Sequence, residues 1–213
     1  MSRRLRYQVA MSLDGFIAGT KGEYDWIVMD PAIDFEALFA EFDTAVMGRK
    51  TYEAMAAQGG GSMPGLDVIV FSRSLRPAEK SGLRIVREDP ARVVAALKAK
   101  PGRDIWLFGG GELFRSLLDA GLVDSVEVAV MPVLIGSGIP LLPPGNRTTL
   151  TLTDCKTLPG SGIVVLAYSV PGAIGPVPRI RFVRTVKGSK STLKETRAAK
   201  KKVPAARSAA KKP

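Results

Sequence analysis

The stretch IWLFGGGELFRSLL, residues 105–118, joins a short apolar run to a segment with helical spacing through three consecutive glycines. Glycine loses more conformational freedom on folding than any other residue, so three glycines at a strand-to-helix corner indicate that something approaches the backbone closely. A phosphate group at the N-terminus of the following helix is one candidate, and a tight turn that admits no side chain is the other. The dinucleotide fingerprint G-x-G-x-x-G does not fit, because Phe114 stands where its third glycine would be. A second glycine triple, Gly59–Gly61, precedes no helix and is predicted to be a flexible loop.

Strand-like and helix-like segments alternate over the first half of the chain. Apolar runs predict strands at 5–11, 44–47, 67–72, 83–86 and 104–108. Helical spacing between them predicts helices at 34–42, 49–57, 90–99 and 112–119, the first and third with Asp34 and Asp89 as N-cap residues. This order is typical of an α/β protein in which crossover helices connect parallel strands.

The pattern changes to strands alone after residue 123. Strands are predicted at 125–133, 147–155 and 162–170. The last two are separated by the turn-forming residues Pro159–Gly162, which indicates an antiparallel hairpin added to the sheet. The sequence therefore predicts a mixed, mostly parallel sheet, with a core that includes Val9, Val46, Ile69, Val70, Leu107, Val128, Val130, Val165 and Leu166.

A folded domain is expected over residues 1–172, followed by a basic tail over 173–213. Residues 1–172 carry 18 Lys and Arg against 19 Asp and Glu, whereas the tail carries 13 Lys and Arg against Glu195 alone, so the positive charge belongs to the tail. Its composition offers little apolar surface to offset the entropy of ordering, which predicts disorder after residue 185. Such a tail suits sequence-independent contact with nucleic-acid phosphates. A solubilising tail that binds nothing specific is the alternative.

The composition excludes several kinds of active site. Without histidine the chain has no Ser-His-Asp triad and no His-ligated metal centre, and Cys155 alone forms neither an internal disulfide nor a Cys-cluster zinc site. We therefore expect no metal, and an enzyme of this composition depends on a cofactor that the protein positions. No apolar run approaches the roughly 18 residues that cross a membrane, and no signal peptide precedes the first strand, so a cytoplasmic location is expected.

Two further strand ends carry groups that suit a phosphate. The segment Gly48–Thr51 places a hydroxyl and two cations in a first helical turn, where the helix dipole favours an anion. Solvated cations on an exposed turn are the alternative. Ser72 and Arg73 follow another strand. Because the carboxyl ends of parallel strands meet at one edge of a sheet, we expect these groups to converge with residues 109–111 at the usual ligand edge of an α/β fold.

Five segments of the sequence form a recognisable set, which comprises AMSLDGFIAG (10–19), VMGRKTYE (46–53), VFSRS (70–74), LFGGGELF (107–114) and MPVLIGSGIPLL (131–142). Together they resemble the dihydrofolate reductase superfamily and, within it, the C-terminal reductase domain of riboflavin biosynthesis. The likeness covers residues 5–170 in the same order and leaves the tail outside. It implies a dihydrofolate-reductase-like three-layer fold that binds NADPH in extended form across the carboxyl edge of the sheet.

The resemblance also implies which residues hold NADPH. Ala10 and Ile17 would flank the nicotinamide, and Ser72 and Arg73 would meet the 2′-phosphate of the adenosine. The other phosphates would lie against two helix starts, which comprise Gly48, Arg49, Thr51, Gly109, Gly110, Gly111, Glu112 and Leu113. Because guanidinium groups suit an additional phosphate dianion, Arg49 and Arg73 favour NADPH over NADH.

The substrate side has four candidate residues. Asp14, Trp26 and Asp30 are candidates for substrate binding, and Asp34 is the candidate for supporting protonation. In dihydrofolate reductases the carboxylate lies in the first turn of the helix after the first loop. Asp34 has that local setting, but an Asp at this place also serves as a helix cap, and neither Asp30 nor Asp34 falls at the expected spacing from both Trp26 and Gly48. Asp14 either faces the ligand or closes an Asx-turn.

The sequence thus predicts an NADPH-dependent reductase that transfers hydride to a small pteridine- or pyrimidine-like heterocycle. Residues 12–30, which contain three glycines, would form a lid over the nicotinamide. The family likeness is compatible with a homodimer. The alternative function is a cofactor-binding scaffold with little catalysis, whose basic tail binds nucleic acid non-specifically.

Overall fold

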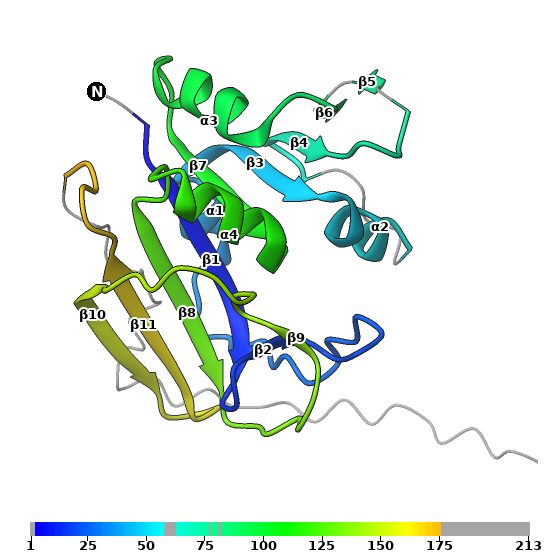
Figure 1. The fold of residues 1–213 in the computed structure, drawn as a ribbon. Helices are drawn as coiled ribbons and strands as arrows, with labels where there is room; N and C mark the ends of the chain where they lie inside the picture. The colour runs from blue at the N-terminus through cyan, green and yellow to red at the C-terminus, as the bar shows by residue number, and fades with distance from the viewer. Residues whose placement is uncertain (1–2, 58–62, 77, 81, 176–213) are drawn as a thin grey trace, which may run out of the picture. The chain divides into compact units, whose positions relative to one another are not determined.

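A computed structural model describes residues 3–57, 63–76, 78–80 and 82–175. Within these residues a mixed sheet has the strand order β10-β11-β8-β1-β7-β3-β4-β6-β5 (Figure 1). The six strands from β8 to β6 in that order are mutually parallel, and β11, β10 and β5 are antiparallel to their neighbours. The bounds are β1 Leu5–Ser12, β3 Phe42–Gly48, β4 Asp67–Phe71, β5 Ala78–Lys80, β6 Leu83–Val86, β7 Asp104–Gly109, β8 Ser125–Met131, β10 Thr151–Leu158 and β11 Ile163–Ser169.

A second, two-stranded sheet joins two distant loops. Strand β2 (Phe16–Ala18) follows β1, and β9 (Ile139–Pro140) follows β8, and the two pair antiparallel. Close approach makes this pairing possible, because a Cβ atom on Gly138 would lie 2.1 Å from the carbonyl oxygen of Ala18. The loop after the first strand is therefore fastened to the loop after the eighth.

Helices cover both faces of the main sheet and produce three layers. Helix α3 (Pro90–Lys98) and helix α4 (Gly111–Asp119) pack on one face through Val94, Leu113 and Leu117. Helix α1 (Phe35–Phe39) and helix α2 (Arg49–Ala57) contribute Leu38, Tyr52 and Met55 to the other face. In Figure 1, α4 crosses in front of β1 and α1 lies behind the sheet. Side chains alternate along each strand, so β1 sends Leu5 and Tyr7 to one layer and Arg6 and Gln8 to the other.

The predicted α/β architecture and its C-terminal antiparallel hairpin are confirmed, and α2 and β6 have the predicted bounds. The helix predicted at 34–42 was too long, because Phe42 is fully buried and begins β3. The strand predicted at 147–155 was placed too early, because pairing through the Pro159–Gly162 turn sets the register at Leu158 and Ile163. The strand predicted at 125–133 ends at Met131, and the other boundaries differ by one or two residues. Strands β2, β5 and β9 were not predicted.

Six of the predicted core residues are buried: Val46, Ile69, Val70, Leu107, Val128 and Val165. Val9 and Val130 are partly buried against the cluster that contains α3 and α4. Leu166 was expected in the core but is only half-buried, since it lies on β11 toward the hairpin edge, where no described helix covers the sheet.

The end of the described chain is tied to the sheet through Asp124. Its carboxylate accepts hydrogen bonds from the backbone N–H of Leu5 (2.7 Å) and Ile174 (3.2 Å), and it pairs with the Lys98 ammonium at 2.5 Å. Ile174 is therefore attached to the sheet. The predicted basic tail from residue 176 onward and the loop at Gly59–Gly61 lie outside the described residues. Among the described helices none combines the length and apolar character needed to cross a bilayer.

Candidate active site

Two strand ends and the helix starts that follow them meet at the carboxyl edge of the sheet. Strands β3 and β7 are neighbours, with Met47 opposite Gly109, so the chain turns into α2 and α4 side by side. A Cβ atom on Gly110 would lie 3.2 Å from the Thr51 hydroxyl, and one on Gly109 would lie 3.6 Å from the Thr51 methyl group. The predicted convergence of residues 48–51 with residues 109–111 is therefore present.

Each glycine of the triple has its own physical reason. Gly109 has a φ of 151°, a conformation that other residues rarely adopt, and its peptide bond to Gly110 is cis. Gly110 faces Thr51. Gly111 is buried, and a Cβ there would lie 3.1 Å from the carbonyl oxygen of Pro140. Close packing explains why residue 111 is a glycine, in agreement with the tight-turn alternative. Gly110 instead lies where the starts of α2 and α4 meet.

The start of α4 offers backbone N–H groups that have no hydrogen-bond acceptor among the described residues. Gly110 is the N-cap residue and has no side chain to cap the helix, and the N–H of Phe114 donates to the Gly110 carbonyl at 3.0 Å. The N–H groups of residues 111–113 precede the first intrahelical hydrogen bond and can serve an anion. Leu113 can contribute only its backbone, because its side chain is buried in the core, and Glu112 keeps an exposed side chain in the first turn.

The start of α2 presents cations beside open space. Nothing lies within 4 Å of the position that a Cβ on Gly48 would occupy. Arg49 pairs with Glu53 at 2.8 Å, but both side chains are at least 40% exposed, so an anion can compete for the guanidinium. Lys50 is exposed. These residues can meet a phosphate without displacing any part of the fold.

The end of β4 adds a hydroxyl and two more cations. Ser72 is 7% exposed, and its Oγ accepts a hydrogen bond from the N–H of Leu75 at 2.9 Å. Arg73 is exposed. Arg87, which follows the neighbouring strand β6, donates to the Leu75 carbonyl at 3.4 Å and so lies at the same turn. Sequence reasoning missed Arg87, although its place directly after the β6 strand was a usable signal.

Asp14 fastens the turn after β1 to the loop after β8. Its carboxylate accepts hydrogen bonds from the backbone N–H of Gly136 (2.7 Å) and Ile135 (3.1 Å). The hydroxyl of Ser12 and then these two N–H groups hold the pKa of Asp14 below its usual value. The sequence left open whether Asp14 faces a ligand or closes an Asx-turn, and the structure shows this longer-range link in place of the Asx-turn. Ala10 and Ile17, the residues expected beside the nicotinamide, lie half-buried on either side of that turn.

Asp30 makes a second link of this kind. It is 6% exposed and accepts hydrogen bonds from the Ser161 hydroxyl (2.5 Å) and the N–H of Ala32 (2.8 Å). These hydrogen bonds, that of Ser161 first, hold the pKa of Asp30 below its usual value. The indole of Trp26 donates to the carbonyl of Glu23 at 3.3 Å. Asp30 and Trp26, which the sequence suggested for substrate binding, thus form hydrogen bonds to other residues of the chain.

Asp34 caps α1. Its Oδ1 accepts a hydrogen bond from the N–H of Ala37 at 2.9 Å. Ile33 and Leu38, on either side of Asp34 in the sequence, belong to two different apolar clusters on the α1 face of the sheet. Asp34 therefore lies where the chain passes from one cluster to the other. Among the described residues, its Oδ2 has no hydrogen-bond donor.

A buried polar cluster lies on the α1 face of the sheet and includes two residues of β1 that precede Ala10. Arg6 is fully buried and forms two 2.8 Å hydrogen bonds with the carboxylate of Glu127, which is 2% exposed. Glu127 also accepts from Ser125 at 2.7 Å and from the amide of Gln8. Burial by itself lowers the pKa of Arg6, but the hydrogen bonds and charges of Glu127, and then of Glu41, raise it above its usual value. Arg6 therefore stays charged and pairs with the buried carboxylate of Glu127.

This cluster was not recognised in the sequence. A signal was nevertheless present, because a central parallel strand is buried on both faces and normally reads as a continuous apolar run. Arg6 and Gln8 interrupt that run in β1, and Glu127 interrupts it in the neighbouring β8. Polar side chains at such positions must be paired inside the protein.

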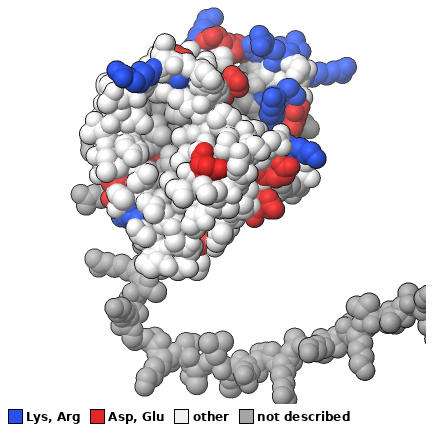
Figure 2. Space-filling model, turned by 60° about the horizontal axis from the view of Figure 1, so that its bottom comes forward, with Lys and Arg blue, Asp and Glu red and all other residues white. Residues whose placement is uncertain are grey.

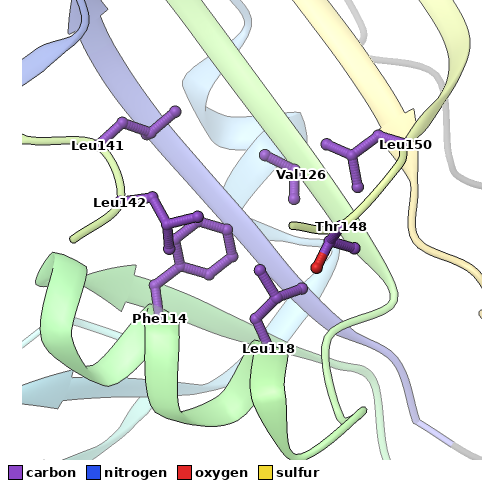
Figure 3. Close-up of a pocket in the computed structure, with 7 residues that line it drawn as sticks. All are labelled: Phe114, Leu118, Val126, Leu141, Leu142, Thr148 and Leu150. Atoms are coloured by element: carbon purple, nitrogen blue, oxygen red, sulfur yellow. The ribbon is translucent and has the colours of Figure 1, made fainter. Parts of the chain in front are cut away.

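The carboxyl edge of the sheet also includes the ends of β1 and β8. Figure 2 brings forward the end of the molecule at which β1 and β8 finish, and this end is mostly uncharged. Leu13 and Leu134 are more than 60% exposed there. A separate cavity of about 100 Å³ lies on the α4 side of the sheet (Figure 3). Its lining is apolar except for the hydroxyl of Thr148, so it offers no groups for a phosphate.

The sequence places the chain in a known family. The model of the RibD C-terminal domain matches residues 3–165. The chain belongs to the RibD C-terminal domain family. Among its relatives, the Bacillus subtilis protein YyaP is 31% identical over 183 residues, which cover 78% of this chain and 94% of YyaP.

Solved structures show the same fold. A diaminohydroxyphosphoribosylaminopyrimidine deaminase/5-amino-6-(5-phosphoribosylamino)uracil reductase from Thermotoga maritima has a TM-score of 0.60 at 14% identity, covering 79% of this chain and 57% of that one. Dihydrofolate reductase from Enterococcus faecalis, complexed with NADP(H), has a TM-score of 0.59 at 17% identity, covering 80% and 99%. This member of the RibD C-terminal domain family therefore has the three-layer fold of dihydrofolate reductase.

Proposed function

We propose that the protein is an NADPH-dependent reductase that transfers a hydride to a pyrimidine- or pteridine-like heterocycle. The observation that carries the proposal is the meeting of two helix starts at Thr51 and Gly110, with unpaired backbone N–H groups on one side and Arg49 on the other. Of the two named reductases with this fold, one is named for a uracil derivative, and the other is named for dihydrofolate and was solved with NADP(H).

The residues present fit the cofactor. The absence of a side chain at Gly48 and Gly110 leaves the backbone accessible, and a Cβ at Gly110 would crowd Thr51. The N–H groups of residues 111–113 and the Thr51 hydroxyl would hold the pyrophosphate, with Arg49 as counter-ion. Ser72, Arg73 and Arg87 would hold the 2′-phosphate. When bound, NADPH supplies the hydride, which no amino-acid side chain can provide.

The chain's own contribution to the reaction is orientation and a proton. Ala10 and Ile17 would flank the reacting ring, and the links from Asp14 to residues 135–136 keep the turn between them in place. Asp34 would support protonation through Oδ2, the oxygen that does not cap α1, either directly or through a water molecule.

Titration with NADPH and NADH, followed through the fluorescence of Trp26 and Trp106, tests the cofactor site. We expect NADPH to bind at least about tenfold more tightly than NADH, which corresponds to ~1.4 kcal/mol. NADPH oxidation with 5-amino-6-(5-phosphoribosylamino)uracil or dihydrofolate then tests the reaction. Failure of both nucleotides to bind would refute the proposal.

A further inference from the structure

Gln8 has a buried hydrogen-bond acceptor without a donor. Its Nε2 donates to the carboxylate of Glu127, whereas its Oε1 is buried and accepts no hydrogen bond from any described residue. The side chain as a whole is 8% exposed. A buried polar atom left unpaired is unfavourable and rare in folded proteins. A donor from outside the chain would satisfy it.

Glu127 decides which end of the Gln8 amide remains free. A carboxylate only accepts hydrogen bonds, so the amide turns its NH₂ group toward Glu127 and its carbonyl away. Rotating the amide by half a turn would bring two oxygens together. Arg6 and Ser125 hold the Glu127 carboxylate by three hydrogen bonds of 2.7–2.8 Å. Because Glu127 is held in place, the amide of Gln8 keeps this orientation. Glu127 is thus a positioning residue for Gln8.

Gln8 lies beside Trp106, which packs against a partly exposed aromatic ring. It is two residues before Ala10 on β1, and its backbone carbonyl accepts a hydrogen bond from the Trp106 indole at 3.3 Å. The Trp106 ring lies 5.5 Å from that of Phe39 on α1, and Phe39 is 43% exposed. None of the residues of α1 is buried. Gln8 and the partly exposed ring of Phe39 thus both contact Trp106, and an aromatic ring near a fixed side-chain carbonyl suits a flat heterocycle with a donor on its edge.

We propose that Gln8 Oε1 accepts a hydrogen bond from a ring N–H of the substrate and thereby selects uncharged heterocycles, such as uracil derivatives, that carry this donor. This inference rests on the proposed reductase function, because it assigns the substrate side of the same site. A ring that lacks the donor would leave Oε1 unpaired in the complex, and sites of this kind discriminate strongly against such analogues.

The test uses the full chain loaded with saturating NADPH and two probes, uracil and 1,3-dimethyluracil, the second of which has no N–H group. Binding is followed by NMR titration. We expect uracil to bind at least tenfold more tightly than 1,3-dimethyluracil. In Gln8→Met, which keeps the length of the side chain but removes its carbonyl, the two probes should bind within twofold of each other. Tyr7→Phe is the matched control, because it removes a buried hydroxyl from the same strand on the opposite face of the sheet, away from Gln8, and it should keep the preference.

The outcomes separate this inference from the proposed function. NADPH affinity is measured in the same samples and should be equal in wild type and Gln8→Met. If NADPH does not bind, the proposed function fails. If NADPH binds but wild type shows no affinity for uracil, or no preference between the probes, the role of Gln8 is overturned. A preference that survives in Gln8→Met overturns it as well, and a water molecule paired with Oε1 would produce that result.

Discussion

The hydroxyl of Thr51, in the first turn of α2, lies 3.2 Å from the position that a Cβ atom on Gly110 would occupy at the start of α4. Two helices that begin after different strands are thus within contact distance at their positive ends. Any group held between them receives the field of both helix dipoles.

Substitution of Gly110 should weaken NADPH binding without unfolding the protein. The backbone of Gly110, with φ −72° and ψ 168°, is open to any residue, so Gly110→Ala should fold. Its methyl group would crowd Thr51 and reduce NADPH affinity about tenfold, or ~1.4 kcal/mol. Gly110→Asp, which adds a negative charge, should abolish binding. Isothermal titration calorimetry measures both, with Gly160→Ala as a distant control, and wild-type affinity in Gly110→Asp would remove the glycine triple from the site.

Arg73 and Arg87 should distinguish NADPH from NADH. Each guanidinium can form charge-assisted hydrogen bonds to a 2′-phosphate, so Arg73→Ala and Arg87→Ala should each lower NADPH affinity about tenfold. NADH affinity should not change. Arg103→Ala removes the same charge at the amino end of β7, on the opposite edge of the sheet, and should affect neither nucleotide. Equal losses for NADPH and NADH would mean that these arginines do not contact the 2′-phosphate.

Two substitutions of Asp34 should separate its cap from its proposed role in protonation. Asparagine caps helices as well as aspartate, so Asp34→Asn should keep the wild-type free energy of unfolding, whereas Asp34→Ala should lose about 1 kcal/mol. Asp34→Asn nevertheless lacks an ionisable carboxyl, and its kcat for NADPH oxidation should fall about 100-fold. Urea unfolding and steady-state kinetics provide the two readouts. A wild-type kcat in Asp34→Asn would leave Asp34 as a cap only.

Asp30 should stabilise the fold in a pH-dependent manner. Asp30→Ala removes the acceptor for Ser161 and for the N–H of Ala32, and we expect the free energy of unfolding at pH 7 to fall. Because the folded-state pKa of Asp30 lies below its usual value, ionised Asp30 stabilises the protein fully above that usual value, and this contribution disappears as the pH falls through the folded-state pKa. The difference between wild type and Asp30→Ala should therefore shrink in urea titrations between pH 6 and pH 3, on the order of the range in which carboxylates titrate. A constant difference would contradict the assignment.

Local sequence predicted the elements that carry their own periodicity. Helix α2 and strand β6 have the bounds that the spacing of apolar residues indicates, and the turn at Pro159–Gly162 is where the Pro and Gly residues place it. Strands β2 and β9 are two or three residues long and exist because two distant loops meet, so no local pattern announces them. Phe42 fits the helical spacing of the preceding residues, but complete burial in β3 outweighs that local preference.

The candidate site was predictable where backbone and sequence order determine it. Glycines and hydroxyls at the ends of parallel strands meet because the topology brings those ends to one edge. The roles of Asp14 and Asp30 were not predictable, since each depends on a partner more than 120 residues away. The orientation of Gln8 depends in the same way on Glu127, which lies 119 residues later in the chain.

The segment 138–143 contacts both the region around β2 and the start of α4. Gly138 packs against Ala18, the N–H of Leu141 donates to the Gly15 carbonyl at 2.9 Å, and the Pro140 carbonyl closes over Gly111. A loop exchange or an insertion there would disturb β2, which contains Ile17, and the start of α4 together. Substitutions meant to change the proposed nucleotide preference are therefore best confined to Ser72, Arg73 and Arg87. These residues follow β4 and β6, away from segment 138–143.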